Sequence, residues 1–147
     1  MKKILLVEDN SDDIELMKRA MRKSTVKCEL KVVMDGLQAI EYLKSKNINE
    51  YMPNLIILDL NLPKISGLDL LKKIRSMIKF KNIPIVVLST SREESDLLRA
   101  YQLHSKSYIR KPVGFSKFMH VLDRVIEYWL DINKLPNFQI EEKQNEN

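Results

Sequence analysis

Leu55-Ile56-Ile57-Leu58-Asp59 is the stretch that decides the fold: four apolar residues in a row that end on a carboxylate. An apolar run without alternation is typical of a strand covered on both faces, as strands of a parallel sheet are. Pro53 precedes the run, and a segment rich in turn residues follows it over residues 60–67. The sequence therefore predicts a buried strand at residues 55–58, with Asp59 at its carboxyl end.

Strands and helices alternate on both sides of this run. Further apolar or alternating runs predict strands at residues 3–7, 29–34, 85–88 and 107–109. Apolar residues at helical spacing predict helices at residues 10–21, 37–43, 68–78 and 115–129, and one that begins at Ser91, where Ser91 and Glu94 have the spacing of a capping box. Five strand–helix repeats predict an α/β fold, a parallel sheet with helices on both faces.

Composition limits the class of protein. The 147 residues suit one domain, and 44% hydrophobic residues suffice for a core. The single cysteine, Cys28, excludes a disulfide framework and fits a core position in a reducing, cytoplasmic protein. No apolar run approaches the roughly 18–20 residues of a membrane span, and the first run ends at Val7, too early for a signal peptide. The net charge is +5, but the basic residues are scattered, so we expect no direct nucleic-acid partner and no membrane partner.

Polar side chains stand at the carboxyl ends of four expected strands. In strand order they are Glu8 with Asp9, then Asp59, Ser89 and Lys111. Alone, each has an ordinary explanation, such as a turn residue, a helix start or a solvated lysine. Because the carboxyl ends of parallel strands meet at one edge, where α/β proteins place their sites, we expect the five side chains to lie together.

This set of side chains predicts phosphoryl chemistry. Clustered carboxylates repel one another, and a hard divalent cation with oxygen ligands relieves that repulsion. Glu8, Asp9 and Asp59 are therefore candidate ligands for Mg²⁺, with Mn²⁺ as a substitute. Beside the metal, Asp59 could attack phosphorus and form an acyl phosphate. Lys111 would neutralise the phosphoryl oxygens, and Ser89 would hydrogen-bond one of them.

The sequence resembles a response-regulator receiver domain of two-component signalling over residues 1–131. Four segments carry the resemblance: ILLVEDN at residues 4–10, LIILDLNLP at 55–63 with Gly67, PIVVLS at 84–89 and YIRKP at 108–112. The resemblance implies a flavodoxin-like (βα)5 fold with strand order 2-1-3-4-5. Residues 132–147 are then expected to form a partly disordered C-terminal extension.

The resemblance also implies roles for individual residues. Asp59 would accept a phosphoryl group from a sensor histidine kinase, with Lys111 and Ser89 assisting. The backbone carbonyl of Asn61 would join the metal ligands Glu8, Asp9 and Asp59. Ser89 and Tyr108 would form the switch pair, and the Lys111–Pro112 peptide would be cis. Such a protein promotes its own phosphorylation and dephosphorylation without being a turnover enzyme.

More narrowly, the chain resembles the single-domain regulators of bacterial phytochrome-type sensors, which implies a phytochrome-like kinase as partner. Asp12-Asp13, Tyr101–His104, Tyr128–Leu130 and Leu135-Pro136 carry this resemblance. Thr90 departs from the alanine common in receivers and would narrow access to the phosphate. The apolar residues near the end of the last helix either support a homodimer or pack that helix end: Tyr128, Leu130, Ile132 and Leu135.

Three other functions compete with this interpretation. An aspartate-nucleophile phosphatase needs a second acid two residues after the nucleophile, where this chain has Asn61. A flavin or nucleotide carrier needs a glycine-rich phosphate loop, and the chain has only 3 glycines. A receiver-like interaction module that is never phosphorylated would keep the fold and leave the acids, hydroxyl and lysine idle.

Overall fold

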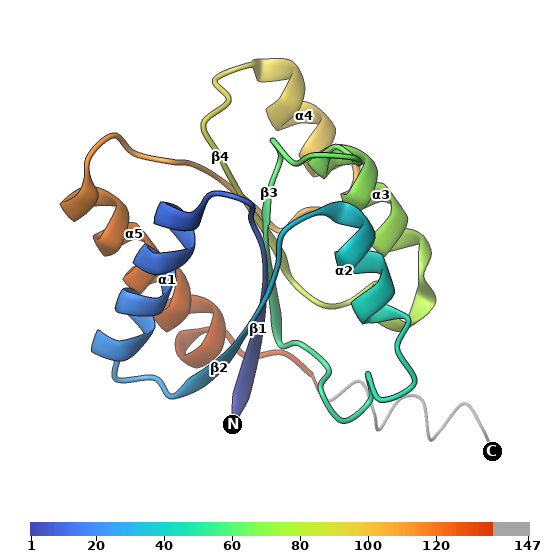
Figure 1. Cartoon of the computed structure of the whole chain (residues 1–147), viewed down its shortest axis with the longest axis horizontal. Coiled ribbons are helices and arrows are strands. Elements are labelled where there is room, and N and C mark those ends of the chain that lie inside the picture. Colours follow the sequence, from blue (N-terminus) through green and yellow to red (C-terminus); the bar gives the residue numbers. More distant parts are fainter. Residues whose placement is uncertain (137–147) are drawn as a thin grey trace.

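A five-stranded parallel sheet runs through the middle of the molecule in the computed structural model, which describes residues 1–136 (Figure 1). The strands are β1 (Lys2–Val7), β2 (Cys28–Val33), β3 (Leu55–Asp59), β4 (Ile85–Ser89) and β5 (Ser107–Arg110). Their order in the sheet is β2-β1-β3-β4-β5. The predicted strand order is therefore confirmed. Strand β3 lies at the centre of the sheet and is buried, and burial is what its apolar run predicted.

Helices cover both faces of the sheet. They are α1 (Ser11–Lys23), α2 (Gly36–Leu43), α3 (Gly67–Ser76), α4 (Glu94–Gln102) and α5 (Phe115–Glu127), with a 3₁₀ turn η1 (Ile78–Phe80) after α3. Figure 1 shows α1 and α5 on one face and α2, α3 and α4 on the other. The predicted α/β class and helix placement are thus confirmed.

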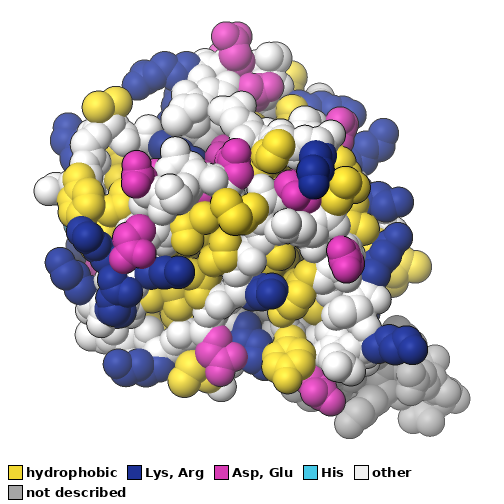
Figure 2. All heavy atoms as spheres, viewed as in Figure 1, with side chains coloured by type: hydrophobic (Ala, Val, Ile, Leu, Met, Phe, Trp, Pro, Cys, Tyr) yellow, Lys and Arg dark blue, Asp and Glu magenta, His cyan; other side chains and the backbone are white. Residues whose placement is uncertain are grey.

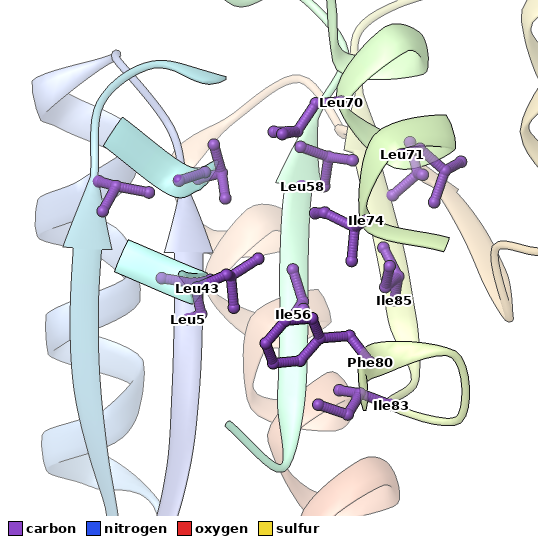
Figure 3. Packing of buried hydrophobic residues seen from close by; sticks show 14 of the residues in the cluster. Leu5, Leu43, Ile56, Leu58, Leu70, Leu71, Ile74, Phe80, Ile83 and Ile85 are labelled. Atoms are coloured by element: carbon purple, nitrogen blue, oxygen red, sulfur yellow. The ribbon is translucent and has the colours of Figure 1, made fainter. Parts of the chain in front are cut away.

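Two apolar cores flank the sheet because the side chains of each strand alternate between its faces. Figure 3 shows the core beneath α2 and α3, where Leu5, Ile56 and Leu58 of the strands meet Leu70 and other side chains of the helices. On the other face, Ile57 packs with residues of α1 and α5. All five residues of β3 are buried. At about 1.5–3 kcal/mol per buried large apolar side chain, this strand contributes much of the driving force for folding.

The sequence signals correctly place the start of α1 but not that of α4. Asn10 caps α1, since its Oδ1 accepts hydrogen bonds from the amides of Asp12 (2.9 Å) and Asp13 (3.1 Å). The predicted capping box at Ser91 is wrong, because α4 begins at Glu94. Ser91 is held in the preceding loop instead. Its Oγ donates to Oδ2 of Asp96 (2.6 Å) and its amide donates to Oγ of Ser89 (3.1 Å).

The last helix ends in a widened turn. After α5, residues Tyr128–Ile132 form a π-helical segment, η2. Leu130 is only 2% exposed and packs in the core between the sheet and α1 and α5. For this residue, packing of the helix end therefore holds, and not support of a dimer. Tyr128, Ile132 and Leu135 are exposed. Most of the expected C-terminal extension, residues 137–147, lies outside the described residues.

Charged and apolar side chains are mixed on the face of the molecule that Figure 2 shows. In the view of Figure 2, lysine and arginine side chains are scattered among acidic and apolar ones. Within residues 1–136, no helix combines the length and the apolar character that crossing a bilayer requires.

Candidate functional site

Three carboxylates meet at the carboxyl edge of the sheet. Glu8 and Asp9 follow β1, Asp59 ends β3, and these strands are neighbours. One carboxylate oxygen from each residue lies within 4.8 Å of the others. Glu8 and Asp59 are buried and Asp9 is exposed. The structure therefore brings together the three acids that the sequence singled out.

A buried lysine faces this cluster. The Lys111 ammonium nitrogen, Nζ, lies 3.1 Å from Oε2 of Glu8 and 3.2 Å from Oδ2 of Asp59. It lies 2.8 Å from Oδ2 of a further carboxylate, Asp13. The lysine side chain is only 8% exposed. An ammonium group has three N–H donors, so each of the three carboxylates can take one.

Asp13 is the member of this site that the sequence prediction missed. It stands in the first turn of α1, where an acidic residue already has an ordinary role beside the helix dipole. Two signals pointed to this residue: the Asp12-Asp13 pair carries part of the resemblance to phytochrome-type regulators, and its position in the chain lies near the acids. Asp13 is the third helical residue after the cap Asn10, close to the end of β1.

The pKa values of Glu8 and Lys111 are both raised, for different reasons. Burial, followed by the negative charge of Asp59, raises the pKa of Glu8 to about 8, although Lys111 opposes the shift. Burial alone would lower the pKa of Lys111. The hydrogen bond to Asp13 and the charges of Glu8 and Asp59 outweigh it and raise that pKa above its ordinary value. The lysine is thus held charged, while an acid beside it resists ionisation.

The loop after β3 folds tightly over the strand end. The Asn61 amide donates to Oδ1 of Asp59 (3.1 Å), and its side-chain Nδ2 donates to Oγ1 of Thr90 (3.3 Å). A Cβ atom at Gly67 would lie 2.4 Å from Cα of Leu60, so only glycine fits where α3 begins. The loop places Asn61 beside the acid, but a role for its carbonyl as a metal ligand stays a prediction.

The two residues of the predicted switch pair are joined through one loop residue. Ser89 is buried, and its Oγ accepts a hydrogen bond from the amide of Ser91 (3.1 Å). The Tyr108 hydroxyl donates to the carbonyl oxygen of the same Ser91 (3.4 Å). Ser89 and Tyr108 therefore both contact Ser91 in the β4–α4 loop.

The predicted cis peptide between Lys111 and Pro112 is wrong. The described residues contain no cis peptide bond. Directly after β5, the Lys111 amide donates to the carbonyl oxygen of Ser89 (2.8 Å). In this trans arrangement the lysine side chain already reaches Asp59 and its two other carboxylates.

The donor set fits a hard divalent cation. Glu8, Asp9 and Asp59 offer only oxygen atoms, which Mg²⁺ and Mn²⁺ prefer. Two of these acids are buried, where their mutual repulsion is least screened. A cation held by these three residues would relieve it.

Comparison with known proteins agrees with this site. Residues 4–123 match the family model described as the response regulator receiver domain. The chain belongs to this receiver-domain family. The receiver is 38% identical over 137 residues to the response regulator Rcp1 of Synechocystis. The aligned part covers 92% of this chain and 93% of that relative.

Solved structures place the receiver among the same relatives. It superposes on the phosphorylated cyanobacterial phytochrome response regulator RcpA with a TM-score of 0.86 at 43% identity, covering 92% of this chain and 99% of the other. It superposes on the Mn²⁺-bound form of Rcp1 with a TM-score of 0.86 at 37% identity, covering 93% and 100%. The resemblance to phytochrome response regulators and the receiver fold are thus confirmed. The roles predicted for single residues stay predictions.

Proposed function

We propose that this receiver accepts a phosphoryl group on Asp59 from a sensor histidine kinase and switches conformation in response. The observation that carries the proposal is the meeting of Asp59, two further acids and Lys111 at one sheet edge. A structural role explains one such residue but not a buried lysine and three clustered acids together, because burying charges is costly.

The transfer needs a nucleophile and charge neutralisation. An Asp59 carboxylate oxygen attacks the phosphorus of a phosphohistidine. The new P–O bond forms as the P–N bond breaks, and the leaving imidazole keeps the electron pair of that bond. Mg²⁺ held by Glu8, Asp9, Asp59 and the carbonyl of Asn61 would supply positive charge to the phosphoryl oxygens. Lys111 would donate a hydrogen bond to one of them from the other side.

The response would run through Ser89. The oxygen of its hydroxyl already accepts the Ser91 amide, which leaves the hydroxyl hydrogen free to be donated to a phosphoryl oxygen. A shift of Ser89 would reach Tyr108 through Ser91, whose carbonyl the tyrosine hydroxyl contacts. The phosphoryl group thereby favours one arrangement of the β4–α4 loop through contacts that it makes only in that arrangement.

The receiver is proposed to be a switch and not a turnover enzyme. Asn61 stands where an aspartate-nucleophile phosphatase needs an acid, and an amide cannot transfer a proton in that role. Its side-chain amide instead donates a hydrogen bond to Oγ1 of Thr90.

The partners follow from the family and the exposed surface. The names of the phytochrome response regulators among the relatives support a phytochrome-type sensor kinase as partner. The single cysteine supports a reducing, cytoplasmic setting. Exposed Tyr128, Ile132 and Leu135 near the end of α5 support a homodimer. The basic residues are scattered, so we expect that the receiver does not bind nucleic acid directly.

Intact-mass measurement tests the proposal. The protein is incubated with Mg²⁺ and acetyl phosphate, a small phosphodonor, beside the matched variant Asp59→Asn. We expect one phosphoryl group on the wild type and none on the variant. An unmodified wild type at every Mg²⁺ concentration would instead support an interaction module that is never phosphorylated. Sustained turnover of a phosphate ester would support a phosphatase.

A further inference from the structure

We propose that Asp13 is a positioning residue that holds the Lys111 ammonium group beside Asp59 when a divalent metal occupies the other carboxylates. The inference rests on the proposed function, because it assigns a further residue to the same phosphoryl-accepting site. It starts from the three carboxylates around Lys111, of which Asp13 is the nearest.

The contact is short and its backbone is fixed. Lys111 Nζ lies 2.8 Å from Asp13 Oδ2, against 3.1 Å and 3.2 Å for the other two carboxylates. The amide of Asp13 donates to the side chain of the helix cap Asn10. Because this hydrogen bond fixes the backbone of α1 at its first turn, the Asp13 carboxylate has little freedom to follow Lys111 if the lysine moves.

Asp13 differs from the other two acceptors in its relation to the metal. Glu8 and Asp59 belong to the group of oxygen atoms that could ligate one ion, and Asp13 does not. A cation bound there uses lone pairs of Glu8 and Asp59 and repels a neighbouring ammonium group. Lys111 then loses part of its attraction to two acceptors and keeps the third. Asp13 is therefore the anchor that does not depend on the metal.

Burial makes this anchor effective. The side chains of Lys111 and Asp13 are 8% and 22% exposed, so water screens their attraction less than it screens a surface ion pair. A charge-assisted hydrogen bond of this length also limits the rotamers of the lysine. The ammonium group stays where phosphoryl oxygens on Asp59 would arrive, and its placement needs no rearrangement during transfer.

The test compares two variants in the same helical turn. In Asp13→Asn the charge that holds Lys111 is lost while the side-chain shape is kept. In Asp12→Asn the same charge is removed from the same turn, but Asp12 is exposed and has no contact with Lys111 among the described hydrogen bonds and ion pairs. Phosphorylation by acetyl phosphate is followed at saturating Mg²⁺ over a range of donor concentrations. We expect Asp13→Asn to lower the maximal rate by about tenfold, the order of one charge-assisted hydrogen bond, and Asp12→Asn to leave it close to wild type.

A second background separates positioning from folding. In Lys111→Met, adding Asp13→Asn should change the rate no further, because the lysine that Asp13 positions is absent. Asp13→Glu should restore part of the rate. Equal losses of rate in Asp12→Asn and Asp13→Asn would overturn the proposal, because the loss would then come from the net charge of the helical turn. A further loss of rate in the Lys111→Met background would overturn it in favour of a structural role for Asp13.

A readout without phosphorylation completes the test. The ammonium resonance of Lys111, followed by NMR with Mg²⁺ bound, should be visible in the wild type and lost by exchange in Asp13→Asn. If the wild type is never phosphorylated but this difference appears, the proposed function fails while the anchoring by Asp13 stands. An unchanged resonance in Asp13→Asn would refute the anchoring by itself.

Discussion

The ammonium nitrogen of Lys111 lies 3.2 Å from Oδ2 of Asp59, although 52 residues separate the two along the chain. The register of the sheet produces this contact. Asp59 pairs with Leu88 across β3 and β4, and Ser89 pairs with Arg110 across β4 and β5. The residue after β5 is therefore carried to the edge where β3 ends.

Removing the lysine should destabilise the metal-free receiver. Lys111→Met leaves three carboxylates without their cation, two of them buried, and the loss of one partner from a buried ion pair costs about 3–5 kcal/mol. We expect the free energy of unfolding, measured by urea denaturation with a chelator, to fall by that order. Added Mg²⁺ should narrow the difference. The exposed Lys18→Met on α1 serves as control, and equal stability of both variants would contradict the role of the lysine.

The stability of the metal-free receiver should fall with rising pH because of Glu8. Its carboxyl has an ordinary pKa of 4.5 when unfolded and about 8 when folded. Between these values the folded state binds more protons, so the free energy of unfolding decreases as pH rises. Thermal unfolding with a chelator should show this slope in the wild type and a flatter one in Glu8→Gln. The control Glu41→Gln changes an exposed residue and should keep the wild-type slope. If Glu8→Gln also kept the wild-type slope, a raised pKa of Glu8 would be excluded.

Gly67 should be required for the shape of the loop after Asp59. In Gly67→Ala the new Cβ would lie 2.4 Å from Cα of Leu60 and 2.5 Å from the carbonyl oxygen of Asp59, so backbone must move. We expect a loss of about 1–3 kcal/mol in stability and a lower Mg²⁺ affinity. Denaturation and calorimetric Mg²⁺ titration measure the two effects. Wild-type Mg²⁺ affinity in this variant would show that the loop does not shape the site.

Ser89 should transmit phosphorylation to Tyr108 without being the acceptor. In Ser89→Ala the acids and Lys111 are intact, so Mg²⁺-dependent phosphorylation should persist. The phosphorylation-induced change in the NMR signals of Tyr108 should be lost, because the hydroxyl that contacts the phosphoryl group is gone. The exposed Ser95→Ala on α4 should keep that change. If the Tyr108 signals still changed fully on phosphorylation of Ser89→Ala, the phosphoryl group would act on Tyr108 by a route other than Ser89.

The strand ends could be predicted from the sequence because each apolar run stops at a polar residue. That pattern located Asp59, Ser89 and the acids after β1, and the parallel topology brought them together. The family resemblance supplied what the pattern could not, such as the pairing of Ser89 with Tyr108.

The errors concern local geometry that depends on tertiary contacts. Ser91 and Glu94 have the spacing of a capping box, but Ser91 is committed to Ser89 and Asp96 in the loop. Asp13 has the pattern of a helix-start residue, and its spacing along the chain does not reveal that its carboxylate contacts Lys111 in the folded protein. For Leu130 the sequence left open whether it supports a dimer or packs the helix end, and it is buried four residues after the buried Ile126.

Chemical trapping of the phosphorylated residue tests the central claim most directly. Borohydride reduces an acyl phosphate and converts the aspartate that carries it to homoserine, which peptide mass spectrometry can locate. After treatment with Mg²⁺ and acetyl phosphate, the account predicts homoserine at position 59 in the wild type and at no other aspartate. Its yield should fall in Lys111→Met, which lacks the ammonium group beside Asp59. An unchanged Asp59, or homoserine at Asp9 or Asp13, would contradict the account.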